Sequence, residues 1–121
     1  MSKKFIYICS PLRGDYEKNT ENAETYCYVI MRHVPDAVPL APHIYFPRFL
    51  DDNDEEERKL GIAAGIALLD KCDELWAFGI YNPSEGMKYE IDYAKKHGIP
   101  VRDGYDAMRE AIHKSMQGGT L

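Results

Sequence analysis

A short apolar run near the start of the chain, "FIYICS" at residues 5–10, constrains the fold more than any other feature. Successive side chains are apolar, so both faces of this strand need cover, as in a parallel sheet. Shorter strand-like runs recur downstream, and segments with helical spacing separate them. We therefore predict an α/β fold: a single Rossmann-like (flavodoxin-like) three-layer domain over residues 1–121, with a mostly parallel sheet of four or five strands.

The expected elements alternate along the chain. Strands are predicted at 5–10, 37–43, 74–79 and 99–101. Helices are predicted at 20–33, 54–72, 84–98 and 105–116. Prolines in the second strand place it near a sheet edge. Ser84 suits the start of a helix and Gly98 suits its end.

Charge and composition exclude several classes of partner. The formal net charge is −5, so a nucleic-acid polymer is not the expected partner. No apolar run approaches the roughly 20 residues of a membrane span, and no membrane association is expected. Cys9, Cys27 and Cys72 lack metal-ligand spacing and are expected to be free thiols in a cytoplasmic protein. The acidic stretch 51–54 lacks the glycine of a calcium loop, so neither a metal nor a cofactor is expected.

Three loops carry the polar residues suited to chemistry. Ligands bind beyond the carboxyl ends of parallel strands, so "SPLRGD", "PHIYFP" and "GIYNPSEGM" are expected to meet at one edge of the sheet. In the first loop, Arg13 can bind a phosphate or carboxylate, Gly14 permits close backbone approach, and Ser10 adds a hydroxyl. The loop is neither a Walker A sequence nor a G-x-G-x-x-G, and an ordinary turn with a solvated arginine is an equal alternative.

The other two loops leave similar alternatives open. His43 stands near Tyr45 and further aromatic residues, which indicates either a stacking wall for a base or a plain aromatic cluster. Ser84 can cap a helix whose first amides form an anion site. Glu90 lies about one and a half turns into that helix. Alone, such a glutamate is more often a solvated charge, but helical side chains lean towards the N-terminus, so it can also reach the sheet edge.

Together these stretches resemble the nucleoside 2-deoxyribosyltransferase superfamily, including the 2'-deoxynucleoside 5'-phosphate N-hydrolases and small bacterial and phage relatives. The resemblance rests on "IYICSPLRGD", "APHIYFPRFLDD", an "ER" with a "G" shortly after, "LLDKCDELWAFG", "S-x-GM-x-x-E" and "GIPV", in this order over residues 5–101. These motifs are specific for the superfamily and less specific for the reaction. They imply cleavage of the N-glycosidic bond of a nucleoside or nucleotide, or deoxyribosyl transfer, through a glutamate nucleophile.

The resemblance also implies roles for individual residues. Glu90 matches the nucleophile that attacks the anomeric carbon. His43 matches a position lining the base pocket, and Ser84 matches a serine that contacts phosphate or sugar. The loop that holds the 5'-phosphate maps onto Ser10, Pro11, Leu12, Arg13 and Gly14. Further substrate contacts are expected from Tyr7, Tyr45, Gly86 and Met87.

One position departs from the superfamily pattern. Characterised members carry an aspartate shortly before the "CD" motif, where it assists protonation or orients the nucleophile; this chain has Gly65 there. Asp51 and Asp52 are the candidate catalytic replacements, because they follow the aromatic loop and can fold over the site, whereas Asp73 is expected to be structural. The alternative function is therefore a non-catalytic protein that senses or sequesters a nucleotide. A structural interaction protein is the weakest hypothesis.

A homodimer or larger homo-oligomer is also expected. Members of the superfamily usually complete the site with a residue from a neighbouring subunit, and a chain of 121 residues has little room for a closed pocket. The aromatic segment "YFPRF" at residues 45–49 and the long middle helix are the expected interface.

Overall fold

The apolar run forms the strand β1, Lys4–Cys9, which lies inside a four-stranded sheet. The computed structural model describes residues 3–118. The strand order is β2-β1-β3-β4, with β2 at Ala37–Leu40, β3 at Glu74–Ala77 and β4 at Val101–Asp103. Each neighbouring pair is parallel. The predicted parallel α/β sheet is confirmed, and β2 lies at an edge, as its prolines predicted.

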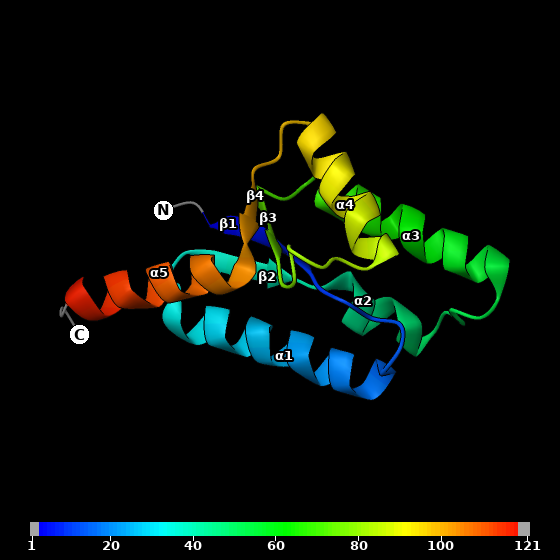
Figure 1. Ribbon diagram of the computed structural model, residues 1–121, viewed down its shortest axis with the longest axis horizontal. Coiled ribbons are helices and arrows are strands. Elements are labelled where there is room, and N and C mark those ends of the chain that lie inside the picture. Colours follow the sequence, from blue (N-terminus) through cyan, green and yellow to red (C-terminus); the bar gives the residue numbers. More distant parts are fainter. Residues whose placement is uncertain (1–2, 119–121) are drawn as a thin grey trace.

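Long helices cover both faces of this sheet, α1 and α5 on one side and α3 and α4 on the other (Figure 1). Their bounds are Tyr16–His33 for α1, Glu55–Leu69 for α3, Glu85–Lys96 for α4 and Gly104–Gly118 for α5. Alternation along β1 sends Ile6 and Ile8 into the core under α1 and α5, and Tyr7 and Cys9 into the core under α3 and α4. Both faces of β1 are therefore buried from Ile6 to Cys9, and the three-layer prediction is confirmed.

The capping residues explain where the helices begin. Asp15, Asp54 and Ser84 each accept a hydrogen bond from a backbone amide of the first turn, at 3.2, 3.1 and 3.3 Å. The first helix was predicted to begin at residue 20, which is wrong, because the Asp15 cap starts it at Tyr16. Gly98, at φ +73°, follows the end of α4 as predicted, in a backbone region that favours glycine.

The second strand was predicted to reach residue 43, which is also wrong. It ends at Leu40, and a short helix α2, Pro42–Tyr45, follows and leads into the 3₁₀ turn η1, Phe46–Arg48. Pro42 is at the first helical position, where its missing amide hydrogen leaves no bond unmade. His43 therefore lies on a helix rather than at the end of a strand.

Other boundaries also differ from the predicted ones: the helix predicted to end at residue 72 ends at Leu69. The third strand was predicted to end at residue 79 but ends at Ala77, and β4 lies two residues beyond the predicted start at 99. Within residues 3–118, none of the helices combines the length and apolar character needed to cross a membrane.

Candidate active site

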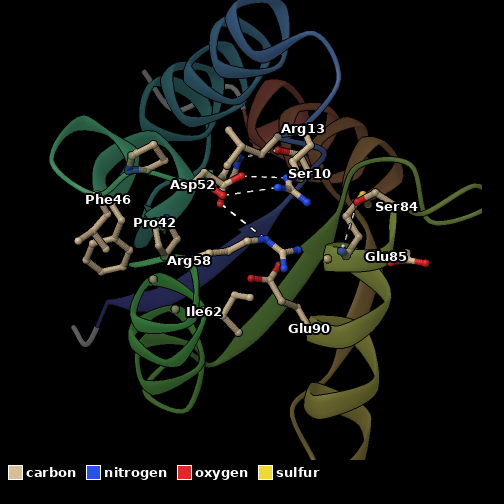
Figure 2. A pocket seen from close by; sticks show the side chains of 18 of the residues that line it. Ser10, Arg13, Pro42, Phe46, Asp52, Arg58, Ile62, Ser84, Glu85 and Glu90 are labelled. Atoms are coloured by element: carbon tan, nitrogen blue, oxygen red, sulfur yellow. Dashed lines mark hydrogen bonds and ion pairs between the residues drawn. The ribbon is translucent and has the colours of Figure 1, made fainter. Parts of the chain in front are cut away.

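A cavity of about 370 Å³ opens at the carboxyl ends of β1 and β3. Its walls come from the loop after β1, the α2–η1 segment, the first turns of α3, and the start of α4 (Figure 2). This is the edge where parallel α/β sheets bind ligands, and the volume is within the range of small-molecule sites. The three loops predicted to meet do so here.

A tyrosine and a glutamate form the floor of this cavity. The Tyr7 hydroxyl donates a hydrogen bond of 2.5 Å to Glu90 Oε2. Tyr7 is buried in β1, and Glu90 projects from the α4 face that also buries Met87 and Ile91. Burial raises the pKa of Glu90, while the hydrogen bond from Tyr7 partly lowers it. Glu90 is therefore a partly desolvated carboxyl group oriented by the sheet, and not a solvated surface charge.

Gly65 lies directly against this pair. A Cβ atom at position 65 would be 3.2 Å from Tyr7 Oη and 3.9 Å from Glu90 Oε2. The position where an aspartate was expected is thus adjacent to Glu90, and glycine leaves that space without a carboxylate. Asp73 is no substitute, because its carboxylate accepts a hydrogen bond from the backbone amide of Phe5 in β1 and does not line the cavity. Its predicted structural role is confirmed.

A serine and a histidine form one wall. Ser10 Oγ and His43 Nε2 share a hydrogen bond of 2.8 Å that joins the end of β1 to α2. Burial lowers the pKa of His43 to about 4, so the ring is neutral near pH 7. A neutral imidazole carries one donor and one acceptor nitrogen. Besides bonding Ser10, the ring can therefore orient a polar heterocycle placed in the cavity.

Three charged side chains stand at the mouth of the cavity. Arg13 Nε donates to Asp52 Oδ2 at 2.9 Å, and Arg58 Nε lies 3.9 Å from Asp52 Oδ1. Arg13 comes from the loop after β1, Asp52 from the turn before α3, and Arg58 from α3 itself (Figure 2). Two cations thus flank one carboxylate beside the opening.

The N-terminus of α4 supplies another positive region. Ser84, Glu85, Gly86 and Met87 line the cavity, and Ser84 Oγ accepts from the Met87 amide. The first amides of a helix lack intrahelical acceptors, and the helix dipole adds to their positive potential. Arg13 also lines the cavity, so the two positive groups suit an anionic part of a ligand, and Glu85 is the one carboxylate in this first turn of α4.

Most of the residues selected from the sequence meet in this cavity. Those that line it are Tyr7, Ser10, Leu12, Arg13, His43, Asp52, Ser84, Gly86, Met87 and Glu90. Pro11 and Tyr45 do not line it, and the Tyr45 side chain is exposed and packs against Phe46 and Phe49. Gly14 and Asp51 line a neighbouring hollow, which shares Arg13 and Asp52 with the cavity. The functional roles assigned to all these residues stay predictions.

Sequence reasoning singled out Gly65 on α3 but assigned no role to the other residues of this helix that line the cavity. Arg58, Gly61, Ile62 and Gly65 line the cavity from one face of this helix. Their spacing of three, four and seven residues is the signature of one helical face, so the signal was present in the sequence. Pro42, Phe46, Pro47, Leu50, Glu57 and Glu85 complete the lining.

The described residues contain no candidate metal centre. In residues 3–118, no three histidine, cysteine or acidic side chains are close enough to share an ion. Cys9 and Cys72 are buried free thiols, and Cys27 is a half-buried one. Burial raises the pKa of the Cys9 thiol well above its usual value and keeps it protonated beneath the cavity.

Comparison with known proteins places the fold and the cavity in one family. Residues 4–104 match a family described as a domain of unknown function (DUF7768). The chain belongs to this family. The matched span of this DUF7768 member includes all four strands and every residue that lines the cavity. No curated protein matches the chain.

A solved structure shares the fold. It is a 2-deoxyribosyltransferase from the psychrotolerant bacterium Bacillus psychrosaccharolyticus, described as a biocatalyst for nucleoside synthesis. The TM-score is 0.63 and the identity 15%, over 80% of this chain and 69% of that chain. At this identity the likeness shows a common fold, which agrees with the resemblance to the superfamily seen in the sequence.

Proposed function

We propose that the protein cleaves the N-glycosidic bond of a nucleoside or nucleotide, or transfers its deoxyribosyl group, through a covalent ester on Glu90. The observation that carries this proposal is the Tyr7–Glu90 pair on the floor of a cavity at the ligand-binding edge of a parallel sheet. Burial makes the carboxylate a better nucleophile than a solvated one, and the Tyr7 hydroxyl fixes its orientation. The fold shared with a 2-deoxyribosyltransferase supports the same reaction class.

The reaction has two steps. A carboxylate oxygen of Glu90 attacks the anomeric carbon, the carbon–nitrogen bond breaks, and the base leaves with the electron pair and takes up a proton. Water then attacks the same carbon and frees the sugar in hydrolysis, or a second base attacks it in transfer. Both steps pass through an oxocarbenium-like state, which a carboxylate so close stabilises electrostatically.

The rest of the cavity fits the parts of such a substrate. His43 and Phe46 lie on the wall where the base would sit, and the Ser10–His43 hydrogen bond sets the ring orientation. Arg13 and the start of α4 at Ser84 lie where a 5'-phosphate would be held. This arrangement favours a 5'-monophosphate of the N-hydrolase type over an unphosphorylated nucleoside.

One observation favours a second candidate function. Gly65 leaves no carboxylate beside Glu90, although a side chain at this position would contact both Glu90 and Tyr7. A site without this acid has less help in protonating a leaving base. A protein that binds a nucleotide without turning it over is therefore the alternative.

Base release separates the two candidates. The protein is incubated with a panel of 2'-deoxynucleosides and their 5'-monophosphates, with and without a free acceptor base, and the base is followed by chromatography. We expect release from at least one monophosphate and none with Glu90→Gln. Asp92→Asn, an equivalent change at an exposed position of the same helix, is the control and is expected to retain activity. Calorimetric binding without turnover would favour the alternative function.

A further inference from the structure

The two arginines at the cavity mouth share a single carboxylate. The Arg13–Asp52 contact is a direct hydrogen bond of 2.9 Å, and the Arg58–Asp52 contact is looser, at 3.9 Å. Each guanidinium carries five N–H donors, and both approach the Asp52 carboxylate through their Nε edge. Figure 2 shows Arg58 extending from α3 across the cavity between Asp52 and Glu90. Both arginines therefore keep donors available to a group that enters the cavity.

The turn around Asp52 is held mainly by its own hydrogen bonds, and Arg13 Nη2 adds a longer contact of 3.5 Å to the Asp52 backbone carbonyl. The Asp51 amide donates to Glu57 Oε1 at 2.8 Å, and the Asn53 amide donates to Asp51 Oδ1 at 2.9 Å. These bonds tie the turn to the start of α3, where Asp54 caps the helix. The Asp52 carboxylate is thus presented to the arginines by a fixed turn, and its removal leaves the turn intact.

The ion pairs of Asp52 are weak enough to exchange. The side chains of Arg13, Asp52 and Arg58 keep 58%, 34% and 41% of their exposure, and such solvated pairs contribute little free energy. A phosphate carries more charge and more acceptor oxygens than a carboxylate, and arginine binds it through two donors at once. A phosphate that reaches this point can therefore outcompete Asp52 for both guanidiniums.

We infer that Asp52 is a built-in counter-ion of an anion site, and that Arg58 joins Arg13 in binding the phosphate of the ligand when Asp52 is displaced. The inference rests on the proposed function for the kind of ligand, a sugar phosphate. It gives Asp52 a role in specificity: the carboxylate holds the two arginines ready, excludes carboxylates and weak anions, and lowers the affinity for phosphates. It also places Arg58, which belongs to α3 and not to the loop after β1, in the phosphate site.

Calorimetry with 2-deoxyribose 5-phosphate tests this inference, with 2-deoxyribose as the uncharged comparison. The probe has no glycosidic base, so no turnover complicates the measurement. Asp52→Asn keeps the shape of the side chain and removes its charge. This variant is expected to bind 2-deoxyribose 5-phosphate severalfold more tightly and to bind 2-deoxyribose with unchanged affinity. Arg58→Gln is expected to lower the affinity for 2-deoxyribose 5-phosphate about tenfold or more, because a charge-assisted hydrogen bond is lost.

The controls come from a second arginine–aspartate pair. Arg109 and Asp106 form an ion pair on α5, outside the cavity, so Arg109→Gln and Asp106→Asn change the net charge identically and are expected to leave binding unchanged. Weaker or unaltered phosphate binding in Asp52→Asn would overturn the inference, as would unaltered binding in Arg58→Gln. If the variants respond as expected but no base is ever released, the anion site stands and the catalytic proposal fails. If base is released but the variants do not respond, the catalytic proposal stands and the anion site fails.

Discussion

The pKa of Glu90 is set by burial and by hydrogen bonding, which act in opposite directions. Burial between β1 and α4 raises the pKa of the carboxyl group, because a charge is less stable away from water. The Tyr7 hydroxyl lowers that pKa, because it donates to the ionised form. Burial is the larger effect, so the group titrates above an ordinary glutamate and becomes nucleophilic once it loses its proton.

Replacing Tyr7 by phenylalanine separates these effects. Tyr7→Phe removes the hydrogen bond that lowers the pKa of Glu90 and leaves the burial that raises it. The acid limb of the pH profile of kcat/KM, which reports ionisation of the free enzyme, is therefore expected to move to higher pH. The measurement is base release across the acidic range. Tyr93→Phe, which breaks a tyrosine–carboxylate bond to Asp70 outside the cavity, is the control, and an equal shift there would contradict the prediction.

The lowered pKa of His43 predicts that the stability of the protein depends on pH. Its folded pKa is about 4 and its unfolded pKa is near the usual 6.5. As the pH falls below about 6.5, the His43 imidazole is protonated in the unfolded chain but stays neutral in the folded chain. The unfolding free energy therefore decreases until the pH reaches about 4. At 1.36 kcal/mol per pKa unit the loss attributable to His43 is on the order of 3 kcal/mol.

Urea unfolding at several pH values measures this loss. His43→Gln is expected to flatten the dependence of the unfolding free energy on pH between these limits, relative to the wild-type protein. A slope in His43→Gln that equals the wild-type slope would show that His43 titrates normally in the folded protein.

At the scale of elements, α4 couples stability to binding through its cap. Ser84→Ala removes the acceptor for the Met87 amide and is expected to cost about 1 kcal/mol of unfolding free energy. Asp103→Ala removes a cap outside the cavity, where the carboxylate accepts from the Tyr105 and Asp106 amides of α5. Both variants are expected to lose similar stability by chemical denaturation, but only Ser84→Ala should also weaken binding of a sugar phosphate. Equal affinity of the two variants for the sugar phosphate would show that Ser84 does not contribute to binding.

The element scale also shows how far local sequence patterns determine the structure. The strong apolar run of β1 and the cap at Ser84 are local signals, so the sheet, its layers and the position of Glu90 were predictable. The helix that begins at Pro42 was not predicted, because a proline after a strand more readily indicates a break in regular structure than the first position of a helix. Local patterns also say which residues share a helix face without saying what that face meets, which left Arg58 unassigned.

Contacts between distant residues were the least predictable part. The Ser10–His43 and Arg13–Asp52 bonds join positions separated by 33 and 39 residues. Their formation depends on how α2 and the turn before α3 fold back over the sheet edge, and no periodicity within either segment encodes that. The resemblance to a superfamily assigned residues of these same loops to one site, because such a resemblance carries information about a whole fold.

At the scale of the whole molecule, an apolar surface beside the cavity predicts self-association. Tyr45 and Phe49 are 61% and 59% exposed, and they contact each other and Phe46, which lines the cavity, at η1. Exposed aromatic clusters of this kind mark interfaces. We expect at least a dimer by light scattering at micromolar concentration, and dissociation in Phe49→Ser. A wild-type monomer under these conditions would contradict the prediction.

The central claim is that Glu90 forms a covalent bond to the sugar, and trapping that bond tests it most directly. A 2-fluorinated deoxyribonucleotide slows both steps by destabilising the oxocarbenium-like state, so the glycosyl ester can accumulate. Intact mass spectrometry followed by peptide mapping should then show one sugar phosphate added per chain, on the peptide that contains Glu90, and none in Glu90→Gln. Base release from the ordinary nucleotide with no adduct on Glu90, or with an adduct on another residue, would contradict the claim.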